Sequence, residues 1–539
     1  MSLTQRPYSA HVDTFTRENL PPRSTWPEFL FTGPELQYPA AINCATELLD
    51  RHVLAGAGSR RCVVTDTETW TYADLLTRSN QVARVLIEEA GLVPGNRVLL
   101  RGPNNPWLVA SWFGVLKAGG VAVTTMPLLR SSELQTMADI AETKIAICDH
   151  RFVEDLERAT IPKLTTLVYG GPSADDLTGL AGSRPADFEN VATASDDVCM
   201  LAFTSGTTGK PKATMHFHRD VLAIADTFSR HVLRPAPNDL FTASPPLAFT
   251  FGLGQSVVFP LRVGAATFLI EQPSPTRMLE AVERHGVTVL ATAPTAYRSM
   301  VPDLSAAGVR SLRACVSAGE TLPKATWDAV HDACGIRIID GIGSTEMLHI
   351  FISAADDELR PGSTGRAVPG YVAEVQDPDG RPVPDGELGR LAVKGPTGCR
   401  YLRGDRQTTY VQDGWNITGD VYVRDSDGYF HYQARADDMI ISAGYNIAGP
   451  EVEEALLRHE AVAEAAVVGV PDENRGMIVK AVVVLRPGAE LGPDPAKTLQ
   501  DFVKSEIAPY KYPRAIEFVE ALPRTATGKL QRFRLREKS

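Results

Sequence analysis

The chain has 539 residues, of which 44% are hydrophobic and 22% are charged, and its formal net charge is -11. A single hydrophobic core does not grow to this size, so the length predicts two or three domains. The acidic balance argues against a bulk-basic nucleic-acid-binding protein, and it leaves room for a local basic pocket for a phosphate ligand.

Cysteines are scattered along the chain without a Cys-x-x-Cys pair, which favours reduced thiols over a disulfide scaffold or a zinc ribbon. The first residues, MSLTQRPYSAHVDTF, lack the apolar segment of a secretory signal, and no apolar run reaches membrane-spanning length. We therefore expect a cytoplasmic protein that binds neither membrane nor nucleic acid, as a monomer or a homodimer. The cysteines are Cys44, Cys62, Cys148, Cys199, Cys315, Cys334 and Cys399.

From about residue 40 the helical and strand patterns alternate, and a buried-type strand at 198–203 runs directly into a glycine-rich stretch. This alternation predicts α/β layers with parallel sheets, in which ligands bind beyond the carboxyl ends of strands. Helices are expected within 71–91 and 107–119, and strands at 97–100, 121–126, 144–149 and 165–170.

The pattern changes after about residue 360, where short strands separated by Pro-Asp-Gly turns predict a β-rich subdomain. The last hundred residues are of a suitable size for a separate α+β domain, with a helix that has Pro450 at its first position and an amphipathic helix over 495–508. We place the boundary near Asp437, which gives an N-terminal domain of 1–436 and a C-terminal domain of 437–539.

The stretch TSGTTGKPK, residues 204–212, has the composition of a phosphate-binding loop. Its two glycines allow close backbone approach, and its hydroxyls, amides and lysines suit phosphoryl oxygens. It is not a Walker A loop, because only Thr207 and Thr208 separate Gly206 from Gly209. Taken alone, the stretch fits a polar surface loop equally well.

Four later stretches carry further polar groups: DGIGSTEM at 340–347, GWNITGD at 414–420, ARADDMIISAGYNI at 434–447 and PRTATGKL at 523–530. Each one alone has an ordinary structural explanation. A carboxylate such as Glu346 can satisfy backbone amides at a helix start, Asp420 can occupy a turn, and a terminal Gly-Lys can be a solvated loop.

The order of all five stretches resembles the acyl-adenylating superfamily, which includes acyl-CoA synthetases, peptide adenylation domains and luciferases. The resemblance extends from about residue 70 to residue 535 and includes Pro103–Pro106, Leu116–Val121 and Gly386–Pro396. It implies an α/β fold: a large N-terminal domain of layered α/β subdomains plus a β-rich subdomain, and a small mobile α+β C-terminal domain. It also implies that a carboxylate reacts with ATP to give acyl-AMP and pyrophosphate, before the acyl group passes to the thiol of coenzyme A.

The resemblance assigns a role to individual residues. The first step needs charge neutralisation and positioning more than a base, because a carboxylate is already ionised at neutral pH. One position departs from the pattern: Ile342 stands where many relatives carry an aromatic ring against adenine. The implied roles are β- and γ-phosphate binding by Thr204, Ser205, Gly206, Thr207, Thr208, Gly209 and Lys210; α-phosphate contact by Thr345; Mg²⁺ ligation by Glu346; adenine contact by Asp340; ribose binding by Asp420 and Arg435; catalysis by Lys529; a hinge at Asp437; and a thiol tunnel at Gly444.

The segment PPLAFTFGLG, 245–254, matches the part of the family that lines the acyl pocket. Together with 340–351 it narrows the resemblance to benzoate-type CoA ligases, and 13–31 is similar to 2-aminobenzoate–CoA ligases. Salicylate has nearly the same shape, so both ortho-substituted acids stay open. The expected pocket residues are Phe249, Phe251, Ala318, Gly319, Gly341, Gly343 and His349, with core packing as the ordinary explanation for either phenylalanine alone.

Three other functions fit parts of this pattern. An aryl-adenylating enzyme that loads a separate carrier protein would use the same first step. A non-catalytic nucleotide binder is disfavoured by the intact Lys529, Glu346 and Asp420. A luciferase-like oxygenase shares the scaffold.

Overall fold

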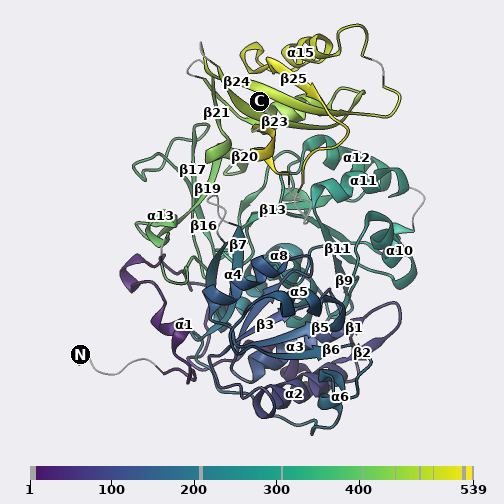
Figure 1. Cartoon of the computed structure of the whole chain (residues 1–539). Coiled ribbons are helices and arrows are strands. Elements are labelled where there is room, and N and C mark those ends of the chain that lie inside the picture. The colour runs from purple at the N-terminus through teal and green to yellow at the C-terminus, as the bar shows by residue number, and fades with distance from the viewer. Residues whose placement is uncertain are drawn as a thin grey trace.

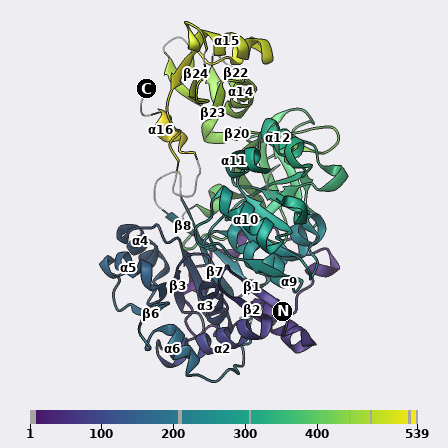
Figure 2. The same cartoon turned by 90° about the vertical axis from the view of Figure 1, so that its right-hand side faces the viewer.

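The computed structural model describes residues 8–205, 211–304, 308–404, 406–442, 445–472, 475–489, 491–524 and 530–536. The chain forms a large body and a smaller C-terminal body, which lies at one end of the molecule in both views (Figures 1 and 2). Three sheets build the large body and one sheet builds the small body.

The first α/β layer is a six-stranded sheet whose strands are parallel, except for an antiparallel hairpin of β7 and β8 at one edge. All residues of three central strands are buried, as expected for parallel strands that are covered by helices on both faces. In spatial order the strands are β6 (Thr165–Tyr169), β5 (Ile145–Asp149), β3 (Arg97–Arg101), β4 (Val121–Thr125), β7 (Val198–Ser205) and β8 (Pro211–Phe217). The helices of this part of the chain are α1 (Phe15–Glu18), α2 (Tyr72–Glu88), α3 (Pro106–Lys117), α4 (Ser131–Ala141), α5 (Val153–Arg158) and α6 (Leu177–Gly182).

The second α/β layer is a nine-stranded sheet, parallel in its centre and antiparallel at both ends. Its strands in spatial order are β15 (Arg366–Ala367), β14 (Ile350–Ser353), β13 (Ile338–Gly343), β12 (Ala314–Ser317), β11 (Val289–Thr292), β9 (Leu240–Ala243), β10 (Ala266–Phe268), β1 (Arg61–Val64) and β2 (Thr69–Thr71). Its helices are α7 (His218–Ile224), α8 (Thr250–Leu253), α9 (Phe259–Arg262), α10 (Pro275–His285), α11 (Pro294–Leu304) and α12 (Lys324–Cys334).

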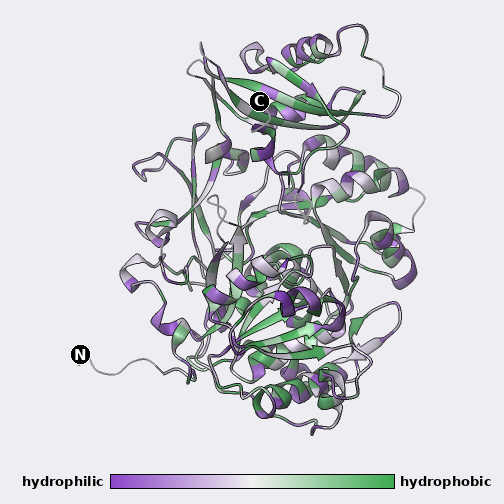
Figure 3. Ribbon diagram, in the orientation of Figure 1, coloured by the Kyte–Doolittle hydropathy of each residue, from purple (hydrophilic) through white to green (hydrophobic). Residues whose placement is uncertain are grey.

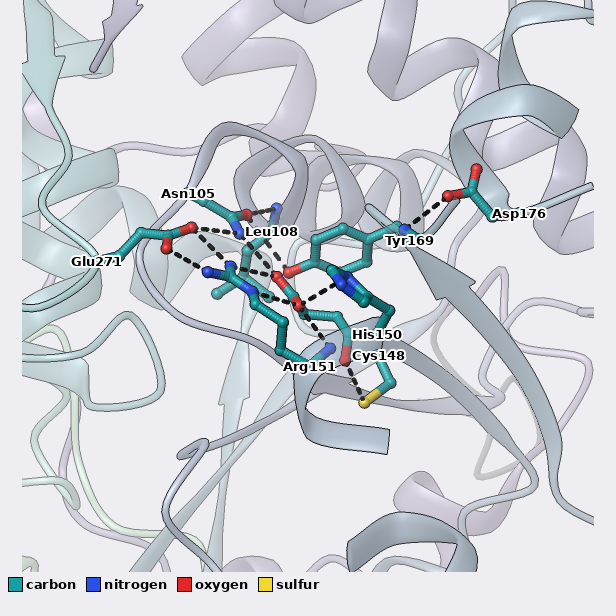
Figure 4. A network of polar contacts seen from close by, with 10 residues as sticks. Asn105, Leu108, Cys148, His150, Arg151, Tyr169, Asp176 and Glu271 are labelled. Carbon is teal, nitrogen blue, oxygen red and sulfur yellow. Dashed lines mark hydrogen bonds and ion pairs between the residues drawn. The ribbon is translucent and has the colours of Figure 1, made fainter. Parts of the chain in front are cut away.

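A polar network joins the two α/β layers (Figure 4). The Arg151 guanidinium donates to Asp149, at the end of β5, and to Glu271, which follows β10, each at 2.7 Å. Asn105 donates to both of these carboxylates at 3.2 Å. Since Asp149 is buried and its contacts are charge-assisted, this network fixes the two sheets relative to each other.

The third sheet is antiparallel and corresponds to the β-rich region predicted after residue 360. It consists of β16 (Val372–Gln376), β17 (Leu388–Lys394), β19 (Trp415–Arg424), β18 (Val411–Gln412) and β20 (Phe430–Arg435), with α13 (Gln407–Tyr410) beside it. The guanidinium of Arg400 and the carboxylate of Asp220 form a fully buried ion pair between this region and α7. Arg400 also lies over the ring of Phe217 at 3.9 Å.

The C-terminal body is a five-stranded sheet with helices, as predicted for an α+β domain. One detail of the prediction is wrong: α14 begins at Gly449, so Pro450 is the second helical residue. The predicted amphipathic helix ends at Glu506. The elements are β21 (Ile440–Ser442), β22 (Tyr445–Ile447), β23 (Val462–Asp472), β24 (Gly476–Leu485), β25 (Ala515–Phe518), α14 (Gly449–Leu457), α15 (Pro495–Glu506) and α16 (Arg532–Arg536).

One large cluster of buried apolar side chains joins the three sheets of the large body, with smaller clusters beside it, and the C-terminal sheet has clusters of its own on its two faces. In Figure 3 many strands are hydrophobic along their length, whereas the helices carry both hydrophobic and polar residues. Within the described ranges, every cysteine is free, and no helix has the length and apolar character needed to cross a membrane. Short 3₁₀ or π-helical segments complete the chain: η1 (Arg23–Thr25), η2 (Pro34–Leu36), η3 (Thr46–Asp50), η4 (Val53–Ala57), η5 (His150–Phe152), η6 (Ala225–Leu233), η7 (Gly254–Val258), η8 (Val309–Ser311), η9 (Asp356–Glu358), η10 (Ala436–Asp438) and η11 (Pro509–Lys511).

Candidate active site

The glycine-rich stretch connects the two strands of the β7–β8 hairpin. Thr204 pairs with Lys212, and Ser205 pairs with Pro211. The stretch therefore follows the carboxyl end of β7, where the sequence predicted a ligand site. Thr204 is half-buried. The other predicted phosphate contacts, Gly206, Thr207, Thr208, Gly209 and Lys210, lie outside the described residues.

The β13–β14 hairpin carries Asp340, the residue expected to meet adenine. Its carbonyl oxygen accepts a hydrogen bond from Ser353 Oγ at 2.6 Å, which ties β13 to β14. Its carboxyl Oδ1 is buried and has no partner among the described residues, and this burial raises the pKa of Asp340 to about 8. A buried acceptor without a donor suits an exocyclic amine. Ile342 packs against the large core, so this position offers apolar contact only.

The turn between β13 and β14 holds Thr345 and Glu346. The Met347 amide donates to Ser344 Oγ at 3.1 Å, and the Leu348 amide donates to the Thr345 carbonyl at 3.2 Å. These two bonds fix the turn, in which Leu348 takes a positive φ of 69°. Thr345 and Glu346 are both half-buried.

A tyrosine positions the Glu346 carboxylate. The Tyr401 hydroxyl donates to Glu346 Oε1 at 2.6 Å, and Lys212 Nζ lies 5.9 Å from the Tyr401 ring centroid. Burial lowers the pKa of Lys212 and raises the pKa of Tyr401, so the phenol stays neutral, and the Glu346 carboxylate interacts with both side chains. One oriented carboxylate suits Mg²⁺, which binds through one or two carboxylates and the phosphates of its nucleotide.

Asp420 and Arg435 lie opposite each other on β19 and β20. Arg435 Nη1 donates to Asp420 Oδ1 at 2.7 Å and to the Thr418 carbonyl at 3.3 Å. The Asp420 carboxylate raises the pKa of Arg435 against the opposing effect of burial. The pair therefore offers an oriented carboxylate for two hydroxyls, with a permanent positive charge beside it.

The segment expected to line the acid pocket is held by Asn104, in the Pro103–Pro106 stretch. Asn104 Oδ1 accepts from the Leu247 amide at 2.8 Å, and its Nδ2 donates to the Pro245 carbonyl at 3.2 Å. Phe249 directly precedes α8, and its amide donates to the Pro246 carbonyl at 3.0 Å. Phe249 and Phe251 are both half-buried.

His349 lies among aromatic rings and is only 3% exposed. Its ring centroid is 5.6 Å from Phe228, 5.6 Å from Phe251 and 4.5 Å from Phe259. Neither ring nitrogen has a hydrogen-bond partner in the described part of the chain, and burial lowers the pKa of His349 to about 3. Glycine is needed at 254, where a Cβ would come within 2.4 Å of the imidazole. His349 is therefore a neutral donor and acceptor in an apolar environment.

The remaining pocket candidates come from the neighbouring strand ends. Ala318 and Gly319 follow β12, whose last residue pairs with Asp340. Gly341 and Gly343 lie in β13, where a Cβ would come within 2.8 Å of Ile350 and 2.7 Å of the His349 backbone. In the structure the rings of Phe251 and His349 are in contact, and the four small residues lie at the adjacent strand ends.

The C-terminal body contacts this region through Arg524. Its guanidinium lies 3.4 Å from Glu320, directly after Gly319, and 2.5 Å from Glu464 of β23. Arg298 of α11 donates to the Ala463 carbonyl at 2.9 Å. Arg524 precedes the predicted catalytic Lys529 by five positions, and Lys529 itself lies outside the described residues.

The expected hinge residue Asp437 lies in η10, between the two bodies. The next residue, Asp438, forms ion pairs with Arg536 and, at 4.0 Å, with Arg532, both from α16. Gly444, expected in the thiol tunnel, lies outside the described residues.

Sequence reasoning missed Tyr401 and Asn104 as site residues. Asn104 carries a signal, because it stands in a stretch that resembles the family. Tyr401 does not, since it meets Glu346 only through pairing of its segment with β8, where Thr214 and Tyr401 form an antiparallel bridge. Together the residues present a buried carboxyl without a partner at Asp340, an oriented carboxylate at Glu346, a second one at Asp420 beside Arg435, and aromatic rings around His349.

Comparison with known proteins agrees with this arrangement. The family described as AMP-binding enzyme matches residues 50–401, and the family described as AMP-binding enzyme C-terminal domain matches residues 451–529. A benzoate–CoA ligase of Thauera aromatica is 38% identical over 515 residues, which cover 94% of this chain and 98% of that protein.

Two solved structures are also similar. The anthranilate CoA ligase AuaEII, in complex with anthranoyl-AMP, superposes with a TM-score of 0.89 at 34% identity and covers 94% of this chain and 99% of its own. A benzoate CoA ligase from Burkholderia xenovorans LB400 superposes with a TM-score of 0.85 at 34% identity, with 92% of this chain and 100% of its own covered.

Proposed function

The chain belongs to the AMP-binding enzymes and is an AMP-forming aryl-CoA ligase for benzoate-type acids, and from this premise we propose that its acid carries a polar ortho substituent, as in 2-aminobenzoate or salicylate. The alternative premise, a carrier-loading enzyme, differs only in the thiol that receives the acyl group.

In the first half-reaction an oxygen of the aryl carboxylate attacks the α-phosphorus of ATP, and the bond to the pyrophosphate oxygen breaks. The products are aryl-AMP and pyrophosphate. Asp340 would accept from the adenine amine, and Asp420 would accept from the ribose hydroxyls. Thr345 and the 204–210 stretch would contact the phosphates, and Lys529 would lie between the carboxylate and the α-phosphate. Fixed donors of this kind stabilise charge as it develops, without reorganisation.

Mg²⁺ fits the site through Glu346, whose Oε1 is held by Tyr401. A bound cation there would neutralise phosphate charge, as it does in other phosphoryl transfers. Tyr401 orients the carboxylate, and the positive charge of Lys212 near the Tyr401 ring would favour phosphate oxygens there.

In the second half-reaction the coenzyme A thiol attacks the acyl carbon, the C–O bond to the phosphate breaks, and AMP leaves. The products are aryl-CoA and AMP. We propose that the C-terminal body turns about Asp437 between the two steps, so that Gly444 enters the site as Lys529 leaves. The two bodies are joined between β20 and β21 by the three-residue η10, which contains Asp437, and a turn at so short a link would move the C-terminal body as a unit.

His349 carries the proposal for an ortho substituent. A neutral imidazole with both nitrogens unpartnered, among Phe228, Phe251 and Phe259, lacks a polar partner that an ortho amine or hydroxyl would supply. The likeness to a structure that holds anthranoyl-AMP points the same way. A site that hydrogen-bonds a substrate group rejects the analogue lacking it, because its own polar atoms are then left unpaired.

The test compares kcat/KM for 2-aminobenzoate, salicylate and benzoate, with ATP, Mg²⁺ and coenzyme A. We expect the wild-type enzyme to prefer an ortho-substituted acid, and His349→Phe to reduce that preference by roughly 10-fold or more, since one buried hydrogen bond is lost. His431→Phe, a change at a partly exposed histidine of β20, should leave the preference unchanged. A wild-type preference for benzoate would refute the ortho proposal, and aryl-AMP without any CoA ester would favour the carrier-loading enzyme.

A further inference from the structure

Outside the proposed active site, two cysteines and a histidine from separate parts of the chain meet in the interior. Cys44 lies two residues before η3, Cys199 is the second residue of β7, and His218 is the first residue of α7. All three are fully buried. Their potential ligand atoms all lie within 4.8 Å of one another.

The geometry of the cluster is close to that of a metal site. His218 Nδ1 lies 3.2 Å from Cys44 Sγ and accepts a hydrogen bond from the Cys44 amide at 3.2 Å, which a cation bound at Nδ1 would displace. Two thiolates on one tetrahedral zinc ion lie about 3.8 Å apart, as bonds of about 2.3 Å require. The 4.8 Å limit on the separations of the ligand atoms lies about 1 Å above this spacing.

A second observation concerns the histidine ring. His218 Nε2 is buried and has no hydrogen-bond partner among the residues that the structure describes. A buried imidazole nitrogen without a partner costs free energy relative to a bonded one. Imidazole beside two thiols is also the donor set of soft or borderline cations, whereas Mg²⁺ and Ca²⁺ require oxygen ligands.

We propose that Cys44, Cys199 and His218 form a binding site for one thiophilic closed-shell cation, Zn²⁺ or Cu⁺. The site is separate from the Mg²⁺ position proposed at Glu346, because its ligands are sulfur and nitrogen. It is a structural site, since all its ligands are fully buried.

The position of the cluster gives the bound ion a function. Cys199 lies near the start of β7, and His218 directly follows β8, where Val198 pairs with Phe217. The 206–210 stretch joins the far ends of the same two strands. An ion held by both residues and by Cys44 would brace the base of the hairpin that carries the phosphate loop.

The experiment removes metal from the whole protein with a chelator, adds Zn²⁺ or, anaerobically, Cu⁺, and measures the metal retained after desalting. We expect about one equivalent per chain in the wild type and its loss in Cys199→Ser and Cys44→Ser. The matched control is Cys148→Ser, because Cys148 is equally buried in β5 of the same sheet and lies outside the cluster. This control should retain the metal.

Two further readouts make the test independent of catalysis and of variant folding. Bound Zn²⁺ should raise the midpoint of thermal unfolding of the wild type by roughly 2 °C or more, as ligand binding to the folded state requires. X-ray absorption of the wild-type complex should show two sulfur ligands and at least one nitrogen ligand. Absence of retained metal, retention by the cysteine variants, or a Cys44–Cys199 disulfide as the only species would overturn the proposal.

Discussion

At the residue scale, two carboxyl groups six positions apart on the β13–β14 hairpin have opposite surroundings. Asp340 Oδ1 is buried and has no hydrogen-bond partner among the described residues. Glu346, in contrast, accepts a hydrogen bond from Tyr401 and lies near Lys212. The first carboxyl keeps its proton near neutral pH, because burial raises its pKa to about 8. The unliganded protein thus holds one protonated acid in the region proposed to bind adenine.

Stability should depend on pH through Asp340. Between pH 4 and pH 8 the folded state holds a proton that the unfolded state has lost, so this group's contribution to stability is full below its ordinary pKa of 3.8 and is lost as pH rises through about 8. Asp340→Asn has no titrating carboxyl at this position, so it removes this loss of folding stability with rising pH. Relative to the wild type, the nucleotide-free variant should gain up to about 1 kcal/mol per pH unit over this window. Unfolding at pH 5, 6.5 and 8 measures it, and Asp385→Asn, at a partly exposed ion pair, should show no such trend.

Tyr401→Phe tests the positioning of Glu346. The variant loses a hydrogen bond to a charged group but keeps the aromatic packing against Tyr410. We expect the Mg²⁺ concentration for half-maximal aryl-AMP formation to rise roughly 10-fold, because such bonds are worth about 1.5–3 kcal/mol. Tyr429→Phe, whose hydroxyl donates to the distant Glu358 carbonyl, is the control. A lower rate at unchanged Mg²⁺ dependence would contradict this role.

At the element scale, the sequence predicted where the strands of the α/β layers lie better than it predicted which strands and residues pair. Residues 145–149 are all buried, and an unbroken apolar run is what such a strand requires. The return strand β8 was not predicted, because its residues PKATMHF carry no comparable pattern. Neither was the contact between Asp420 and Arg435, which depends on the register of β19 with β20. Local patterns report burial, whereas these pairings depend on the whole fold.

The contact between Arg524 and Glu320 should favour the first half-reaction. It draws the segment that precedes Lys529 toward the residues that follow β12. Glu320→Gln weakens this contact between the two bodies. We expect the rate of pyrophosphate release to fall roughly 3-fold, the effect of an ion pair of below about 1 kcal/mol. Thioester formation from supplied aryl-AMP should change less.

Glu506→Gln provides a matched control for this interface. Glu506 pairs with Arg458 inside the C-terminal body, so the same loss of charge leaves the contact between the bodies intact. Equal effects of both variants on both half-reactions would argue against a conformational role for Glu320.

At the scale of the whole molecule, three separate sheets must keep fixed positions relative to one another around one site. The buried Arg400–Asp220 pair joins the antiparallel sheet region to α7, and the Arg151 network joins the two α/β layers. The family resemblance gave the domain order, but these joints between sheets are visible only in the structure, since their members lie 180 and 120 positions apart.

Asp220→Ala should destabilise the large body strongly. It leaves the Arg400 guanidinium, which is fully buried, without its carboxylate. The expected loss is about 3–5 kcal/mol in the free energy of unfolding, because an uncompensated buried charge remains. Denaturant unfolding measures it, with Asp385→Ala at the partly exposed pair with Arg424 expected to cost under about 1 kcal/mol. A loss of similar size in both variants would show that the buried pair is not specially important.

The β13–β14 hairpin limits how the acid specificity of such enzymes can change. On the roles proposed above, the ten residues from Asp340 to His349 contact, in turn, the base of the nucleotide, its α-phosphate, its metal and the ring of the acid. The length of the hairpin therefore sets the distance between the bound nucleotide and the bound acid. A change that lengthens or shifts it to admit a new acid would displace ATP as well. A new acid specificity is therefore easier to acquire by changing side chains from other elements, such as Phe251, that face the ring of the acid. Remodelling the β13–β14 hairpin itself would be harder.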